Sequence, residues 1–129
     1  MPTIDLSRLS SSDYLALVER WKSSAKTPYK RGSISVDEVD LTLGAESETL
    51  IIEFHLLAKD HTLEIVMRGF DAGHRVTWTM PMNDVPSDSS IAYERFVRQA
   101  EETLEHGFAR RHKRFFLEEW KHFNDSVSG

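Results

Sequence analysis

The chain has 129 residues, of which 40% are hydrophobic and 29% charged, and its formal net charge is −5. These values are typical of one globular domain, so the sequence predicts a single domain over residues 1–129. It contains no cysteine, which excludes disulfide bonds, thiol catalysis and thiolate metal sites.

No apolar run approaches the roughly 20 residues that a membrane-spanning helix needs. The first residues also lack the basic and apolar segments of a signal peptide. We therefore expect a cytoplasmic protein with no membrane partner.

Charge is distributed unevenly along the chain. Residues 1–32 carry six basic and three acidic side chains, residues 33–105 carry five and fifteen, and residues 106–129 carry five and three. Phosphate contacts need clustered positive charge, so the acidic middle argues against nucleic acid as a partner of that segment. The two basic ends remain candidate anion sites.

The first predicted element is a helix. Ser10 to Asp13 supply N-cap residues and a first-turn acid. Apolar residues then follow at the i, i+3, i+4, i+7 spacing of one helical face, namely Tyr14, Leu17, Val18 and Trp21. Pro28 disfavours helical geometry in the residue before it, so we expect the helix to end near Ala25 or Lys26.

From Ser33 the apolar period changes to 2, which predicts four β-strands. The first alternation, from Ile34 to Leu43, has one residue too many at Asp37–Glu38, which indicates a β-bulge or a kink. Three short turns are expected, at Gly44–Ser47, Lys59–Asp60 and Asp71–Gly73. Short turns join antiparallel neighbours, so the simplest topology is a four-stranded meander. The residues expected to face the core from the last three strands are Ile52, Phe54, Leu56, Leu63, Ile65, Met67, Val76, Trp78 and Met80.

The helical period returns at Ile91, after the N-cap candidates Ser89 and Ser90, and continues to Phe123. Without a break, this helix would have about 34 residues and a length of roughly 50 Å, against about 20 Å for a six-residue strand. We therefore expect it either to extend beyond the sheet or to break, with Gly107 as the expected break point. The predicted fold class is α+β, with the helices mainly on one sheet face.

The six histidines do not form a metal-binding pattern. His106 and His112 are six residues apart, and His112 and His122 are ten apart, so neither pair matches the spacing of helical metal ligands. We expect no metal and no cofactor.

The outward face of the sheet contains the first candidate site. A two-residue turn at Lys59–Asp60 would place His55 opposite Glu64, as a proton-transfer pair. A similar turn at Asp71–Ala72 would place Arg68 opposite Arg75, where two like charges could bind a carboxylate or phosphate. The alternative is a solvated sheet face with no ligand.

The C-terminal segment contains the second candidate site. Its basic residues are Arg110, Arg111, Lys113 and Arg114, and its aromatic residues include Phe115, Phe116, Trp120 and Phe123. Arginine and aromatic residues together are typical of protein-binding hot spots and of single-stranded nucleic-acid sites. The aromatic residues could equally be core, or could be buried by a second copy of the chain in a homodimer.

Three functions remain open on these residues. The favoured one is a non-catalytic protein-binding module of the inhibitor, immunity, adaptor or chaperone type, with a protein partner and a homodimer through the C-terminal helix. The second is a small-molecule or anion-binding protein, or an enzyme, using the outward sheet face; a deep pocket would favour it. The third is a nucleic-acid-associated protein using the basic tail.

Overall fold

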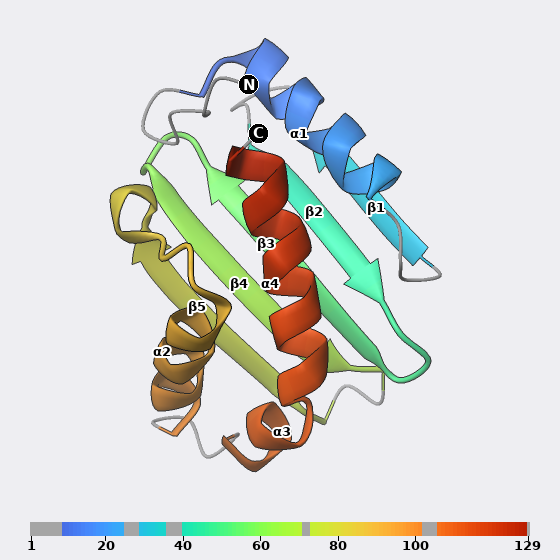
Figure 1. Ribbon diagram of the computed structural model, residues 1–129, viewed down its shortest axis with the longest axis vertical. Coiled ribbons are helices and arrows are strands. Elements are labelled where there is room, and N and C mark those ends of the chain that lie inside the picture. The colour runs from blue at the N-terminus through green and yellow to red at the C-terminus, as the bar shows by residue number, and fades with distance from the viewer. Residues whose placement is uncertain (1–8, 25–28, 36–39, 71–72, 102–105, 129) are drawn as a thin grey trace.

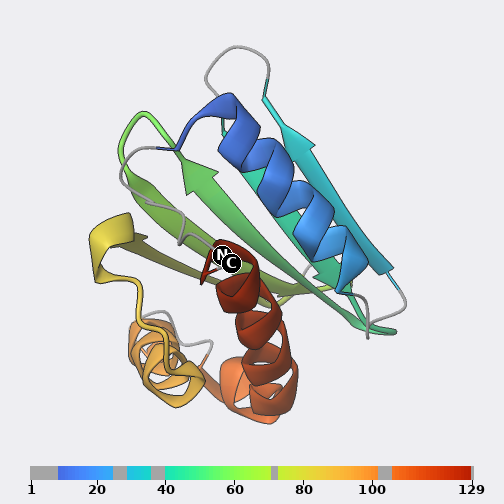
Figure 2. The same ribbon diagram turned by 45° about the horizontal axis from the view of Figure 1, so that its top comes forward.

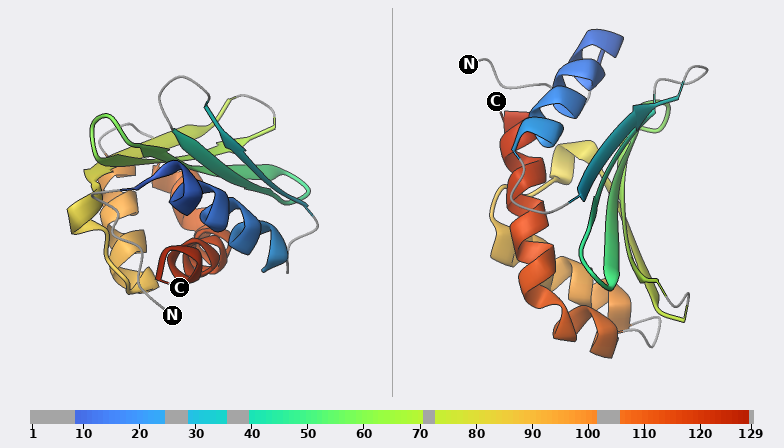
Figure 3. Two further views of the ribbon diagram at one scale, coloured as in Figure 1. Left: turned by 90° about the horizontal axis from the view of Figure 1, so that it is seen from above. Right: turned by 90° about the vertical axis from the view of Figure 1, so that its right-hand side faces the viewer.

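A five-stranded antiparallel sheet is covered by helices on one face in the computed structural model of the protein (Figures 1 and 3). The structure describes residues 9–24, 29–35, 40–70, 73–101 and 106–128. The strands lie in the order β1-β2-β3-β4-β5, a meander with no crossover. The predicted α+β class and antiparallel sheet are confirmed, and the predicted count of four strands is one too low.

Helix α1, Ser11–Ser23, begins with a capping box, because the Asp13 amide donates to the Ser10 hydroxyl and the Asp13 carboxylate accepts from the Ser10 amide. Its four predicted core residues are all buried. Trp21 also attaches the helix to the sheet, since its indole N–H donates to the Gly44 carbonyl over 3.0 Å.

Strands β1, Tyr29–Ile34, and β2, Leu41–Glu46, replace the single bulged strand that the sequence predicts. Beyond the end of β1, the Ser35 amide donates to the Asp40 carbonyl over 2.8 Å. The predicted bulge at Asp37–Glu38 falls outside the described residues. The predicted turn at Gly44–Ser47 is wrong because Gly44 and Ala45 lie within β2.

Strands β3, Leu50–Leu57, β4, Thr62–Gly69, and β5, Arg75–Pro81, form the rest of the sheet. All nine predicted core residues on them are buried. The predicted pairing of His55 with Glu64 and of Arg68 with Arg75 is confirmed. The His61 amide donates to the Ala58 carbonyl, which fits a turn centred on Lys59–Asp60. The other predicted turn, Asp71–Ala72, lies outside the described residues.

After a short 3₁₀ helix, η2, Met82–Asp84, come α2, Ser89–Glu101, α3, His106–Arg111, and α4, Lys113–Ser128. The N-cap of α2 is Asp88, whose carboxylate accepts from the amides of Ser90 and Ile91. Neither predicted N-cap, Ser89 nor Ser90, has this role, because both lie inside the helix.

The predicted long helix is therefore divided into three, and α4 runs back along the sheet in the direction opposite to α2 (Figure 1). Of the two expected outcomes, a break in the helix is therefore the one observed, but Gly107 itself lies within α3, and α4 starts only after His112. Phe96 of α2 and Phe116 of α4 stack with ring centroids 4.6 Å apart. An overhanging helix was the reason to expect a homodimer. That reason no longer holds, and the dimer itself stays a prediction.

The helices cover different parts of the sheet. Helix α1 packs on β1 and β2, α2 packs on β5, and α4 packs on β3 between them (Figures 1 and 2). The core lies between this helical layer and the sheet. At its centre Phe54 stacks on Phe123, with ring centroids 4.6 Å apart.

Gly32 allows α1 to pack closely on β1. A Cβ atom at this position would lie 2.9 Å from Cγ1 of Val18 and 3.2 Å from Cδ2 of Leu43. We expect Gly32→Ala to destabilise the protein by about 1–3 kcal/mol, the usual cost of overpacking. Gly107→Ala is the control, because nothing lies within 4 Å of a Cβ there and alanine favours a helix by up to about 1 kcal/mol. The urea concentration at the unfolding midpoint measures the stability of both variants. A midpoint of Gly32→Ala equal to that of the wild type would contradict the close packing.

Candidate functional site

A cavity of about 360 Å³ opens at the end of the sheet where β3 and β5 begin and β4 ends. We call it the α3 pocket, because helix α3 forms one of its walls. Its lining residues are Glu48, Thr49, Leu50, Gly69, Phe70, His74, Phe108, Arg111 and His112. The volume lies at the lower end of the range of small-molecule sites.

Aromatic rings build one wall of the α3 pocket. His74 and Phe108 stack with ring centroids 5.2 Å apart and planes inclined by 12°. His112 meets the same phenyl ring edge-on, with centroids 5.0 Å apart. Because Phe108 is buried, it fixes the two imidazoles beside it.

The polar groups of the pocket are mainly basic. Burial lowers the pKa of His112, and the positive charges of Arg111 and His74 lower it further. The Arg111 guanidinium is exposed, and no carboxylate in the described part of the chain forms an ion pair with it. An anion entering the pocket would therefore meet a guanidinium that has no ion-pair partner among the described residues and two imidazoles that can donate hydrogen bonds, beside the carboxylate of Glu48.

The basic residues predicted from the sequence do not form one uniform patch. Arg114 pairs with Glu118 over 3.2 Å, and the Lys113 ammonium lies 5.1 Å from the centre of the Tyr93 ring. Arg110 is exposed next to Arg111. Of the four, only Arg111 lines the α3 pocket.

The aromatic residues predicted beside them are largely core. Phe116, Trp120 and Phe123 have no exposed surface, and Phe115 is partly buried against the same core. Of the two alternatives left by the sequence, core packing within one chain is therefore the one that the structure describes. These three rings are not available on the surface of the folded chain.

The outward sheet face brings together the residues of the other predicted site. The Thr42 hydroxyl lies 3.0 Å from Nδ1 of His55, and a Glu53 carboxylate oxygen lies 3.7 Å from its Nε2. Glu53 also pairs with Arg31. Both imidazole nitrogens thus face polar groups of the sheet, as in a structural cross-strand network.

Glu64 does not dominate the titration of His55. The predicted proton-transfer pair implies a raised histidine pKa, but burial lowers the pKa of His55. Glu64 opposes this effect, and the charges of Arg31 and Arg75 add to it. Anion binding by Arg68 and Arg75 stays a prediction.

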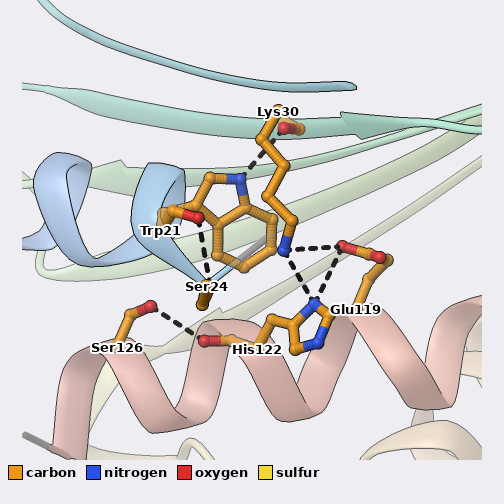
Figure 4. A network of polar contacts seen from close by, with 7 residues as sticks. Trp21, Ser24, Lys30, Glu119, His122 and Ser126 are labelled. Atoms are coloured by element: carbon orange, nitrogen blue, oxygen red, sulfur yellow. Dashed lines mark hydrogen bonds and ion pairs between the residues drawn. The ribbon is translucent and has the colours of Figure 1, made fainter. Parts of the chain in front are cut away.

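A third group of polar residues lies inside the protein, between β1 and α4 (Figure 4). The Lys30 ammonium donates to Nδ1 of His122 over 2.7 Å and lies 3.8 Å from a Glu119 carboxylate oxygen. It also lies 4.4 Å from the centre of the Trp21 ring. The side chains of Lys30 and Glu119 are 3% and 0% exposed. Because an ammonium only donates, His122 accepts here as a neutral imidazole.

Burial determines the chemistry of this cluster. It raises the pKa of Glu119 to about 7, although Lys30 opposes the rise. It also lowers the pKa of Lys30, against the attraction of Glu119. Among the described residues, neither oxygen of Glu119 has a hydrogen-bond partner. These residues line neither the α3 pocket nor the second cavity, which lies on α2, and we regard the cluster as structural.

Sequence reasoning missed both the buried cluster and most of the α3 pocket. The cluster did leave a signal, because Glu119 lies on the apolar stripe between Phe116 and Phe123, and Lys30 is in phase with Ile34. The α3 pocket left little signal in the sequence. Besides the residues of α3, its lining includes residues from turns and strand ends that are far from α3 in sequence, namely Glu48, Phe70 and His74.

Comparison with known proteins adds no assignment: the chain matches no protein-family model, no curated protein and no solved structure. Within the described ranges, no helix is long and apolar enough to cross a membrane. No three histidine, aspartate or glutamate side chains of those ranges gather into a possible metal site.

Proposed function

We propose that the protein binds a small anionic molecule in the α3 pocket, with Arg111 as the main anion-binding residue. The observation that carries this proposal is the convergence of Arg111, His74 and His112 on one cavity of about 360 Å³. A guanidinium can bind a carboxylate or phosphate through two parallel hydrogen bonds. The pocket supports the second function considered from the sequence, at a different place from the outward sheet face.

The test is stabilisation by inorganic phosphate at constant ionic strength. A ligand that binds only the folded state stabilises it, and for a dissociation constant of about 1 mM, about 10 mM phosphate would raise the free energy of unfolding by about 1.4 kcal/mol. We expect thermal or urea unfolding to show this increase for the wild type and not for Arg111→Gln.

Arg114→Gln is the matched control. It removes the same charge three residues further along the chain, in α4, from a side chain that is 92% exposed and paired with Glu118. We expect it to keep the phosphate effect. An equal loss in both variants would indicate general attraction to the basic tail, and no phosphate effect in the wild type would contradict the proposal.

The protein-binding module predicted from the sequence, with a protein partner, stays a separate proposal. Three of the aromatic residues assigned to it are core, so a partner would have to contact the exposed residues Arg110, Arg111, Lys113 and Arg114. Nucleic-acid binding through these residues is a separate proposal with less support, because Lys113 and Arg114 already have partners within the chain.

A further inference from the structure

Two opposite charges line the α3 pocket, and together they restrict what can bind. Arg111 and Glu48 are both exposed, and in the part of the chain that the structure describes neither has an ion-pair partner. A simple anion is attracted by the guanidinium and repelled by the carboxylate. A molecule with both an anionic group and hydrogen-bond donors satisfies both residues.

Phe70 adds an apolar surface to the same pocket. It is 52% exposed, which is high for a phenylalanine side chain. Its position is defined by the backbone, because its amide donates to the Thr49 carbonyl over 3.3 Å. A planar ring placed against Phe70 would remove this surface from water, as bases do when they stack on aromatic side chains.

The size of the pocket limits the ligand further. Known small-molecule sites have volumes of roughly 300–1,000 Å³, and the α3 pocket has about 360 Å³. It therefore suits one ring system with its substituents. A dinucleotide or an extended chain would have to leave most of its surface outside.

Resting on the function proposed above, we infer that the ligand is a planar aromatic molecule that carries both N–H donors and an anionic group. Its anionic group pairs with Arg111, its N–H donors bind the Glu48 carboxylate, and its ring lies against Phe70. A nucleoside monophosphate and an aromatic amino acid share this chemistry.

Titration calorimetry at constant ionic strength tests this inference with four probes. They are adenosine 5′-monophosphate, tryptophan, adenosine, which lacks the anion, and inorganic phosphate, which lacks the ring. We expect adenosine 5′-monophosphate or tryptophan to bind at least about tenfold more tightly than phosphate, because stacking adds to the anion contact. The probe that binds more tightly shows whether the ligand class is a nucleotide or an aromatic amino acid.

Variants of exposed residues separate the contributions without endangering the fold. Phe70→Ala should lose the tenfold advantage and keep the affinity for phosphate. Glu48→Gln should weaken the ring-bearing ligand several-fold without weakening phosphate. Ile91→Ala, at a 49% exposed apolar residue on α2 outside the pocket, should change neither.

The outcomes distinguish this inference from the proposed function. If phosphate binds and both ring-bearing anions bind no more tightly, the inference is wrong and the anion site stands. If no probe binds, both are wrong. If adenosine binds as tightly as its monophosphate, the anion has no role, and both are again wrong.

Discussion

Replacing Trp120 with alanine is expected to destabilise the protein by about 3–5 kcal/mol, the usual cost of truncating a large aromatic residue in a core. Trp120 has no exposed surface. Its ring lies 6.1 Å from Phe54, 6.4 Å from Trp78 and 5.6 Å from Phe123, measured between ring centroids. These neighbours come from two strands and from α4 itself, so no single shift of one element can fill the cavity.

Trp120→Phe is the control for ring size and polarity. The indole N–H of Trp120 is buried, and it has no hydrogen-bond partner within the described residues. Phenylalanine keeps most of the ring contacts and removes this unsatisfied donor, whose burial costs about 1–3 kcal/mol. We therefore expect a much smaller loss, below about 2 kcal/mol. Urea unfolding followed by circular dichroism measures both variants.

The same experiment tests where Trp120 is buried. If it packs within one chain, the unfolding midpoint of the wild type is independent of protein concentration. If a second copy buried it, the midpoint would rise with concentration, because association stabilises the folded state by mass action. If Trp120→Ala unfolds at the same urea concentration as the wild type, the ring of Trp120 is not in the core.

The sheet could be predicted where apolar and polar residues alternate clearly and short turns connect the alternating segments. The alternation from Leu50 to Met80 identifies the inward residues, and short turns set the register of neighbouring strands. This is why the pairing of His55 with Glu64 and of Arg68 with Arg75 could be derived from residue counts alone.

Strand β1 was not predictable because its inward positions do not look like core. Lys30 and Gly32 are two of the three inward residues, and Ile34 is the only apolar one. Lys30 is buried by its partners on α4, and Gly32 is required by the nearby Val18. Both reasons are tertiary, so no local pattern could reveal them. The sequence therefore predicts one bulged strand from Ile34 to Leu43 where the structure has the two strands β1 and β2.

The division of the C-terminal helix was only partly predictable, and the α3 pocket follows from it. One apolar stripe runs from Tyr93 to Phe123, and a stripe is the same in a continuous helix and in two helices packed on one core. The length mismatch with the strands indicates a break. Only the three-dimensional arrangement brings Arg111 of α3 to Phe70 and Glu48 at the end of the sheet.

The buried carboxylate of Glu119 is expected to make stability depend on pH. The ordinary pKa of Glu119 is 4.5, and the folded value is about 7, raised by burial. The folded state therefore binds this proton more tightly than the unfolded state does. The contribution of Glu119 favours folding below about pH 4.5 and is lost as the pH rises to about 7. The shift corresponds to roughly 3 kcal/mol.

Glu119→Gln isolates this contribution from those of the other acids. Glutamine has the same shape as the protonated side chain and does not titrate. We expect the free energy of unfolding of the wild type to fall relative to that of the variant by up to about 3 kcal/mol between pH 4.5 and 8. Urea unfolding across this range provides the measurement; parallel curves would show that the pKa of Glu119 is not raised.

Lys30→Met should cost about 1–2 kcal/mol more at pH 8 than at pH 4.5, because the pKa of Glu119 rises further without the ammonium and the buried carboxyl must then take up a proton. At pH 4.5 this part of the cost should vanish, since Glu119 is then protonated in both proteins. Lys30→Met combined with Glu119→Leu removes both charges and should recover most of the loss at pH 8, as replacing buried ion pairs by apolar residues often does. A cost of Lys30→Met that is the same at both pH values would mean that the ammonium stabilises the protein through its contacts with Trp21 and His122 rather than through Glu119.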